Sequence, residues 1–95
     1  MAQYRILYWK EIPSLVEAIE GEKSSQVFLS TRFQELIDSV AMLEGLSDET
    51  SYLEHWRKGP ILVRDGPPEK VAEAVAVELE ATFADVRARY FQGSG

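Results

Sequence analysis

The sequence predicts an α+β fold, in which a small antiparallel sheet of about four strands packs against three helices. Two observations support this prediction. The first third of the chain consists of short runs of aromatic and branched residues separated by tight turns, which is typical of neighbouring strands. From residue 33 onward, apolar residues recur every three or four positions, which is the spacing of helices. The predicted order of elements is β-β-β-α-α-β-α.

Three strands are expected in the first third of the chain. Both faces of residues 4–9 carry apolar side chains, which predicts a central strand covered on each side. A turn is expected next, because Pro13 cannot donate a ladder hydrogen bond. Short turns between short strands favour an antiparallel meander. The predicted segments after the first strand are a turn at 10–13, a strand at 15–19, a turn at 20–23 and a strand at 26–29.

The first helix is expected to begin just after Ser30 and Thr31. Thr31 and Gln34 have the spacing of a capping box, in which two side chains satisfy free amides at a helix start. Gly45 is a natural end for this helix, since glycine readily adopts the left-handed conformation that stops helices. The expected apolar stripe of the helix comprises Phe33, Leu36, Ile37, Val40 and either Leu43 or Met42.

The second half of the chain predicts a helix, a strand and a longer helix. The second helix starts at Ser47, where acidic residues follow and complement the helix dipole, and it ends at Gly59. Residues 61–64 are expected to form a fourth strand. The longest helix runs from Pro67 to Tyr90, since prolines are tolerated in the first turn of a helix.

Composition indicates one globular domain. The chain has 95 residues, of which 45% are apolar and 27% charged, so we expect a single domain over 1–95. Its ordered core is expected at 4–90, with a frayed tail at 91–95. A net charge of −6 argues against nucleic-acid binding, and apolar runs of at most four residues argue against a membrane span. The absence of cysteine and of a signal peptide favours the cytoplasm.

The residues for self-contained catalysis or metal binding are missing from the sequence. His55 is the single histidine, so a Cys–His pair or an ordinary zinc site cannot form within one chain. The glycine spacing matches neither a dinucleotide loop nor a phosphate-binding loop, and we expect no cofactor. Glu69 and Glu73 share a helix face and could in principle hold a cation or do acid–base work, but a solvated helix face is the favoured explanation. Nothing here requires an enzyme.

Two segments combine a tryptophan with basic residues, and they are the candidate interaction surface. Tryptophan and arginine are the residues that most often anchor protein interfaces. The alternative is that both tryptophans are core residues whose indole N–H groups find a partner at the edge of the core. The candidate residues are Trp9, Lys10, His55, Trp56 and Arg57.

The order of three short motifs resembles the bacterial conserved virulence factor domain family. The motifs are Tyr8-Trp9 with Ile12-Pro13, then Leu29-Ser30-Thr31-Arg32-Phe33, then Tyr52-Leu53 with Trp56-Arg57. The resemblance covers residues 4–90 and implies a small stand-alone accessory or adaptor domain. It adds Arg32 to the candidate surface, because this residue matches the family pattern. It also implies partners among folate and corrinoid one-carbon enzymes.

Three functions follow as hypotheses. The first is a non-catalytic module that binds another protein and is itself a monomer or a homodimer. The second is an accessory subunit of a one-carbon enzyme system, as the resemblance implies. The third is a small-ligand-binding domain with a pocket between the sheet and the helices.

Overall fold

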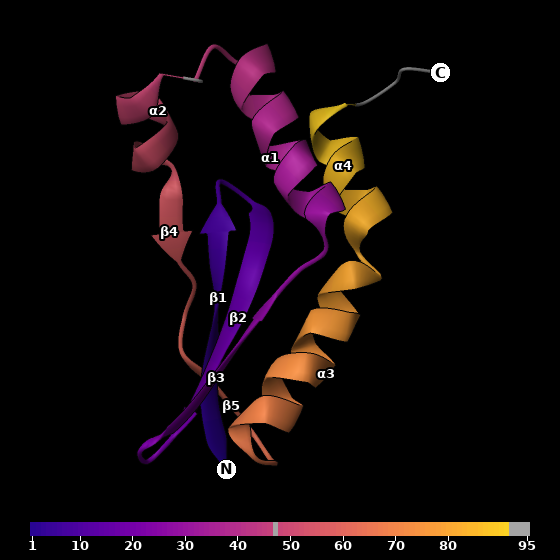
Figure 1. Ribbon diagram of the computed structural model, residues 1–95. Coiled ribbons are helices and arrows are strands. Elements are labelled where there is room, and N and C mark those ends of the chain that lie inside the picture. Colours follow the sequence, from indigo (N-terminus) through magenta and orange to yellow (C-terminus); the bar gives the residue numbers. More distant parts are fainter. Residues whose placement is uncertain (47, 92–95) are drawn as a thin grey trace.

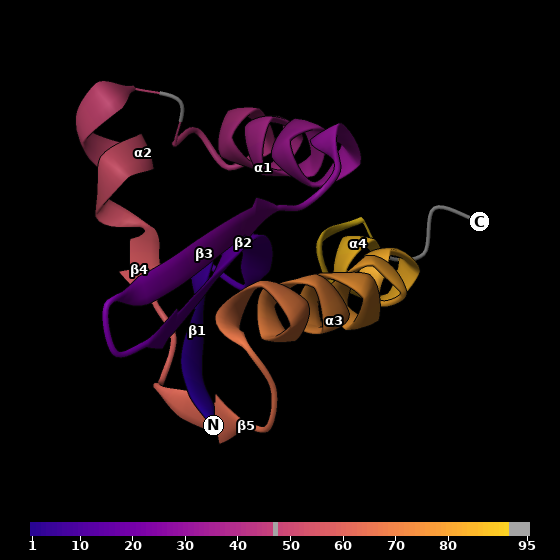
Figure 2. The same ribbon diagram turned by 60° about the horizontal axis from the view of Figure 1, so that its bottom comes forward.

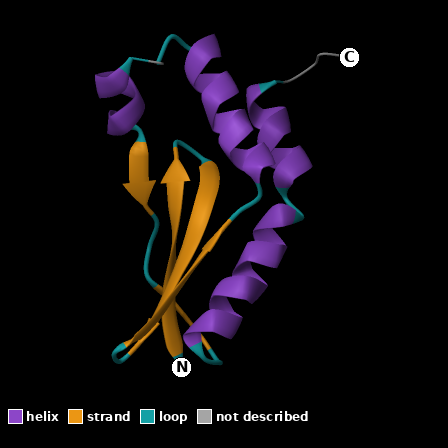
Figure 3. Ribbon diagram, in the orientation of Figure 1, coloured by secondary structure: helices purple, strands orange, loops and turns teal. Residues whose placement is uncertain are grey.

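The fold is α+β, as the sequence predicts, with an antiparallel sheet and helices around it (Figures 1 and 3). The computed structural model describes residues 1–46 and 48–91. The elements in chain order are β1 Ala2–Trp9, β2 Ile12–Glu20, β3 Lys23–Phe28, α1 Thr31–Leu43, α2 Glu49–Glu54, β4 Trp56–Lys58, β5 Leu62–Arg64, α3 Pro68–Glu80 and α4 Phe83–Tyr90.

The sheet is a meander extended by two short strands. Its order is β3-β2-β1-β4, and β5 pairs with the opposite end of β1. β1 is therefore a central strand, as its apolar faces predict. Two-residue turns connect the first three strands, and each turn begins with a residue of positive φ, Lys10 at 55° and Gly21 at 62°. Such turns match the right-handed twist of the strands that they join.

The predicted turn at 10–13 is too long, because β2 already begins at Ile12. Pro13 lies inside the strand and pairs with Tyr8, immediately after a register shift that leaves Ser14 as an extra residue. A bulge is one of the few places in a sheet that accepts proline, since the ladder hydrogen bond is already interrupted there. Ile12 and Pro13 therefore belong to the strand, and the turn that Pro13 predicts is not formed by these two residues.

The first helix lies where the sequence predicts it, but its start is stabilised differently. The N-cap residue is Ser30, and no side chain caps the helix, so the capping box of Thr31 and Gln34 is wrong. The Ser30 amide and hydroxyl both donate to the carboxylate of Glu80, at 2.6 and 2.8 Å. Because α3 supplies this acceptor from a distant part of the sequence, the local pattern could not reveal it. Gly45 has a φ of 72° and follows the helix end, as predicted.

The second helix is shorter than predicted and is followed by a strand. α2 ends at Glu54, and residues 56–58 form β4, which pairs antiparallel with the end of β1. The prediction of a helix up to Gly59 is therefore wrong. Cross-strand pairing of Trp56 with Trp9 outweighs the local helical pattern. The predicted start at Ser47 lies outside the described residues, while Asp48 acts as N-cap by accepting a hydrogen bond from the Ser51 amide.

The long C-terminal helix is in fact two helices. α3 ends at Glu80 and α4 begins at Phe83, so the prediction of one helix to Tyr90 is wrong. Thr82 interrupts the helix, since its amide and its hydroxyl both donate to the carbonyl of Leu79. The change of direction brings Phe83 against Phe33 of α1, with ring centroids 5.1 Å apart in an edge-to-face arrangement. Of the predicted tail at 91–95, only Phe91 belongs to the described residues.

The helices leave one part of the sheet uncovered. α3 packs along β1, β2 and β3, and Figure 2 shows α1 and α3 on opposite sides of the sheet. On the side of α1, Trp9 and Ile12 are fully buried at one end of the strands. Further along the same side, Gln3 and Ile19 are exposed. The predicted cover on each side of β1 is thus complete only near Trp9.

Candidate interaction surface

Five of the six predicted surface residues lie close together, where β1 ends and β4 begins. The register pairs Trp9 with Trp56 and Tyr8 with Arg57. The amide of Lys10 donates to the carbonyl of His55 at 3.0 Å, which joins the hairpin turn to the end of α2. Antiparallel pairing of β1 with β4 therefore brings together two segments that are far apart in the sequence.

Trp9 is the centre of this cluster and belongs to the core. Its side chain is fully buried, and its indole N–H donates to the carbonyl of Tyr52 at 2.8 Å. The rings of Tyr52 and His55 lie with centroids 5.6 Å from that of Trp9. The His55 Nδ1 lies 2.7 Å from the Ser51 carbonyl. These contacts agree with the alternative that Trp9 is a core residue whose indole N–H has one hydrogen-bond partner.

Trp56 and the basic residues cover the rim of the cluster. Trp56 is half-buried, and its ring meets that of Tyr52 edge to face at 6.0 Å. The ammonium of Lys10 pairs with Glu44, and the guanidinium of Arg57 lies 4.5 Å from the ring of Tyr8. Arg57 Nε also donates to the carbonyl of Lys10 at 2.9 Å. The contacts that Trp56, Lys10 and Arg57 make within the chain hold β1, α2 and β4 together.

Arg32 lies apart from the other five residues, at the junction of α1, α3 and α4. Its Nη2 donates to the carboxylate of Glu80 at 3.0 Å and to the carbonyl of the same residue at 2.7 Å. Its guanidinium lies 4.5 Å from the ring of Phe83. Arg32 therefore fastens the start of α1 to the break between α3 and α4.

A different surface, the open sheet face, lies on the side of β1 to β3 that α3 does not cover. The register places its residues in rows across the strands, because side chains of directly paired residues share a face. The rows are Ser24, Ile19, Gln3 and Val63, then Gln26, Glu17 and Arg5, then Phe28, Leu15, Leu7 and Lys58.

A hydrogen-bonded ion pair forms the middle of the open sheet face. Arg5 Nε donates to one carboxylate oxygen of Glu17 at 2.8 Å, and Gln26 Nε2 donates to the other at 3.0 Å. The side chains of Arg5 and Glu17 are about two-thirds buried or more. The hydrogen bond from Arg5 is the main cause that holds the pKa of Glu17 below its ordinary value, while burial opposes it. Glu17 is therefore ionised and satisfied before anything binds.

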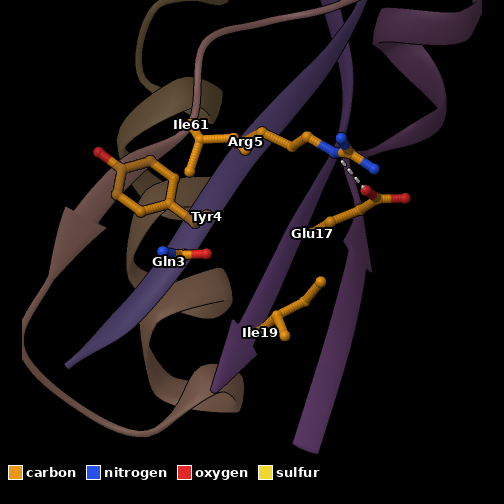
Figure 4. Close-up of a pocket in the computed structure, with 6 residues that line it drawn as sticks. All are labelled: Gln3, Tyr4, Arg5, Glu17, Ile19 and Ile61. Carbon is orange, nitrogen blue, oxygen red and sulfur yellow. Dashed lines mark hydrogen bonds and ion pairs between the residues drawn. The ribbon is translucent and has the colours of Figure 1, made fainter. Parts of the chain in front are cut away.

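Exposed apolar side chains surround this pair. Phe28, Val63 and Ile19 are 70%, 56% and 46% exposed. Ile61 is exposed as well and, with Ile19, lines a shallow depression of about 90 Å³ beside Arg5 (Figure 4). Ligand pockets usually measure about 300–1,000 Å³. This depression is therefore smaller than an ordinary ligand pocket.

Neither a metal site nor a membrane-spanning helix is found among the described residues. Within 1–46 and 48–91, no three His, Asp or Glu side chains gather as a potential metal site. In the same part of the chain, every helix is too short or too polar to cross a bilayer.

Sequence reasoning found the aromatic–basic cluster and missed the open sheet face. The cluster has a local signature, since tryptophan and basic residues are adjacent in the sequence. The open sheet face combines residues from all five strands. The available signal was the polar pair Arg5 and Glu17, which share a face once the hairpin register is known.

Comparison with known proteins identifies a family. A family model described as "Virulence factor" matches residues 7–90 of the chain. No curated protein and no solved structure matches the chain.

Proposed function

The chain belongs to the virulence factor family, whose model spans most of its length, and we propose that it is a protein-interaction domain. The open sheet face is its docking surface. The observation that carries this proposal is that three exposed apolar side chains, those of Ile19, Phe28 and Val63, lie on the same face as an ion pair that is already formed. Antiparallel sheets with one face in water usually present polar side chains there.

The free energy of covering this surface depends on how its polar groups are satisfied. Burying a polar group is unfavourable when it loses hydrogen bonds to water without replacement. The carboxylate of Glu17 accepts from Arg5 and Gln26, so a partner can cover it without supplying a new donor. Covering the surrounding apolar side chains stabilises a complex by about 25 cal/mol for each Å² of apolar surface removed from water. The open sheet face therefore favours contact with a flat, largely apolar surface that offers hydrogen-bond acceptors to the Nη groups of Arg5.

The proposal is tested with the double variant Ile19→Ser and Phe28→Ser. Both side chains are exposed, so the variant is expected to stay folded, as circular dichroism would show. A partner is first captured from the source cells and identified by mass spectrometry, and its affinity is then measured with purified proteins. We expect at least a tenfold loss of affinity in the double variant, because interface anchors are worth more than about 1.4 kcal/mol each.

The matched control is Val77→Ser, which removes an exposed apolar side chain from α3 instead. It should bind like the unmodified protein. An affinity that the double variant leaves unchanged would remove the open sheet face from the proposal. Trp9 does not suit this test, since its truncation empties the core and confuses folding with binding.

The accessory role in a one-carbon enzyme system is a finer form of the same proposal. It requires the captured partner to be an enzyme whose activity depends on this chain. Full activity of that enzyme without the chain would rule this form out, while the interaction itself would stand. A small-ligand function would instead predict that a metabolite raises the melting temperature of the isolated domain.

A further inference from the structure

The two edges of the sheet differ in how they are protected. β4 and β5 form one edge, and each is only three residues long, with Pro60 between them. Short strands and proline are common devices against pairing at a sheet edge. The other edge is β3, which has six residues, no proline and one charge, on Lys23. β3 is therefore the edge that is open to another strand.

The outward-facing backbone groups of β3 follow from the register. The amide of Leu29 donates to the carbonyl of Ser14 at 2.9 Å, so this residue points toward β2. Hydrogen-bonded and non-hydrogen-bonded pairs alternate along an antiparallel ladder. The amides and carbonyls of Ser24, Gln26 and Phe28 therefore point away from β2, toward the free edge. A strand that adds there meets three donors and three acceptors.

The helix beside this edge is acidic. α3 packs along β3, and Glu69 lines a groove of about 490 Å³ together with Lys23, Ser24 and Ser25. Glu73 lies one turn further along the same helix flank. Within the described residues, neither carboxylate forms an ion pair, whereas Glu80 at the far end of the helix pairs with Arg32. Lys23 is the one cation among the groove residues.

We propose that β3 binds a basic, extended segment of another protein by strand addition. This inference rests on the proposed interaction function and names the binding mode and the partner chemistry. Alternate side chains of an added strand point to opposite faces of the sheet. Basic side chains on the α3 side meet Glu69 and Glu73. Apolar side chains on the other side extend the open sheet face beside Phe28.

A second copy of this chain fits the edge less well. Antiparallel pairing of β3 with its own copy would place two α3 helices on the same side of the joined sheet, and each of these helices carries four glutamates and one lysine. Like charges are repulsive, and each chain already carries a net charge of −6. Charge complementarity therefore favours a basic partner over self-association.

The test uses two synthetic peptides, one alternating lysine with valine and the other alternating glutamate with valine. Binding is measured by fluorescence anisotropy at low salt, and we expect the lysine peptide to bind at least tenfold more tightly. Hydrogen exchange is measured by NMR in parallel. The amides of Ser24, Gln26 and Phe28 should become protected when the lysine peptide is bound, since they donate to the added strand.

Two matched pairs of variants make the test specific. Gln26→Pro removes an outward amide, which an edge strand tolerates, while Gln26→Thr removes the same side chain and keeps the amide. We expect at least a tenfold loss of peptide affinity in the proline variant and little change in the threonine variant. Replacing Glu69 and Glu73 by Gln should weaken binding several-fold, whereas Glu54→Gln on α2, which is also exposed, should not.

Four results would overturn strand addition. They are no binding of the lysine peptide, equal binding of the two peptides, equal affinity of the Gln26→Pro and Gln26→Thr variants, and a dimer that Gln26→Pro abolishes in light scattering. The last result would assign the edge to a second copy. If Gln26→Pro leaves binding of the captured partner intact while Ile19→Ser with Phe28→Ser abolishes it, strand addition fails and the proposed function stands.

Discussion

At the scale of single residues, the open sheet face depends on how Glu17 is held. Its two carboxylate oxygens have separate donors, Arg5 on the neighbouring strand and Gln26 on the other side. Lys58 on β4 adds a favourable charge interaction. The three strands on which Arg5, Glu17 and Gln26 lie thus share one polar row, which fixes the orientation of these side chains on the open sheet face.

The pKa of Glu17 reports this arrangement. Because its folded-state pKa is lowered, the ionised carboxylate stabilises the fold above the ordinary carboxyl pKa of about 4.3, and this stabilisation is lost as the pH falls through the folded-state value. Arg5→Gln should raise the pKa of Glu17 toward the ordinary value, which a carbon-13 NMR titration measures. Arg64→Gln is the control and should raise the pKa of Glu78 instead. An unchanged Glu17 pKa in Arg5→Gln would contradict the assignment.

At the scale of elements, the connection from β4 to β5 lies unusually close to β1. The amide of Gly59 donates to the carbonyl of Ile6 at 2.8 Å. A Cβ atom at residue 59 would lie 2.9 Å from Cε2 of Tyr8 and 3.1 Å from that same carbonyl oxygen. The guanidinium of Arg57 packs against the ring of Tyr8. Glycine is needed here for close approach, and this approach lets both short strands pair with one long strand.

Gly59→Ala is therefore expected to destabilise the domain by about 1–3 kcal/mol, the usual effect of forcing an extra methyl group into a filled site. Urea unfolding measures this change. In a protein that already carries Tyr8→Leu, Gly59→Ala should cost less stability than it does in the unmodified protein. The Tyr8→Leu change removes Cε2, but the clash with the carbonyl oxygen of Ile6 is still present. A Gly59→Ala protein as stable as the unmodified one would show that the connection moves away freely.

At the scale of the whole molecule, a single core joins the two sides of the sheet. Buried residues of β1, β2, α1, α3 and α4 form one continuous cluster, which includes Trp9, Phe33, Val71 and Val86. Tyr52 of α2 and Trp56 of β4 pack against the same cluster. Since no element has a separate core among the described residues, the domain is expected to unfold as one unit.

This expectation is tested by following urea unfolding with two signals. Tryptophan fluorescence reports on Trp9 and Trp56 at one end of the sheet, and far-ultraviolet circular dichroism reports on all helices. The two transitions should coincide, as two-state unfolding requires. A fluorescence transition at lower urea concentration than the dichroism transition would show that α2 and β4 detach before the remainder unfolds.

The sequence by itself determined that three strands open the chain, and it located the first helix and its end, although β2 and β3 both begin three residues earlier than predicted. These features depend on local periodicity and turn chemistry, which neighbouring residues encode. It also identified the α+β class and the family, because the motifs that carry the resemblance are local. For the candidate surface, it found the residues that converge on Trp9 but left open whether they bind or pack.

Only the tertiary structure decided that residues 56–58 are a strand, that Thr82 divides the last helix, and that Trp9 is core. Each of these depends on a contact between segments far apart in the sequence, such as Trp56 with Trp9 or Phe83 with Phe33. The open sheet face and the free edge of β3 have the same origin. A surface exists where no other element packs, and local sequence patterns do not reveal which faces the rest of the chain leaves uncovered.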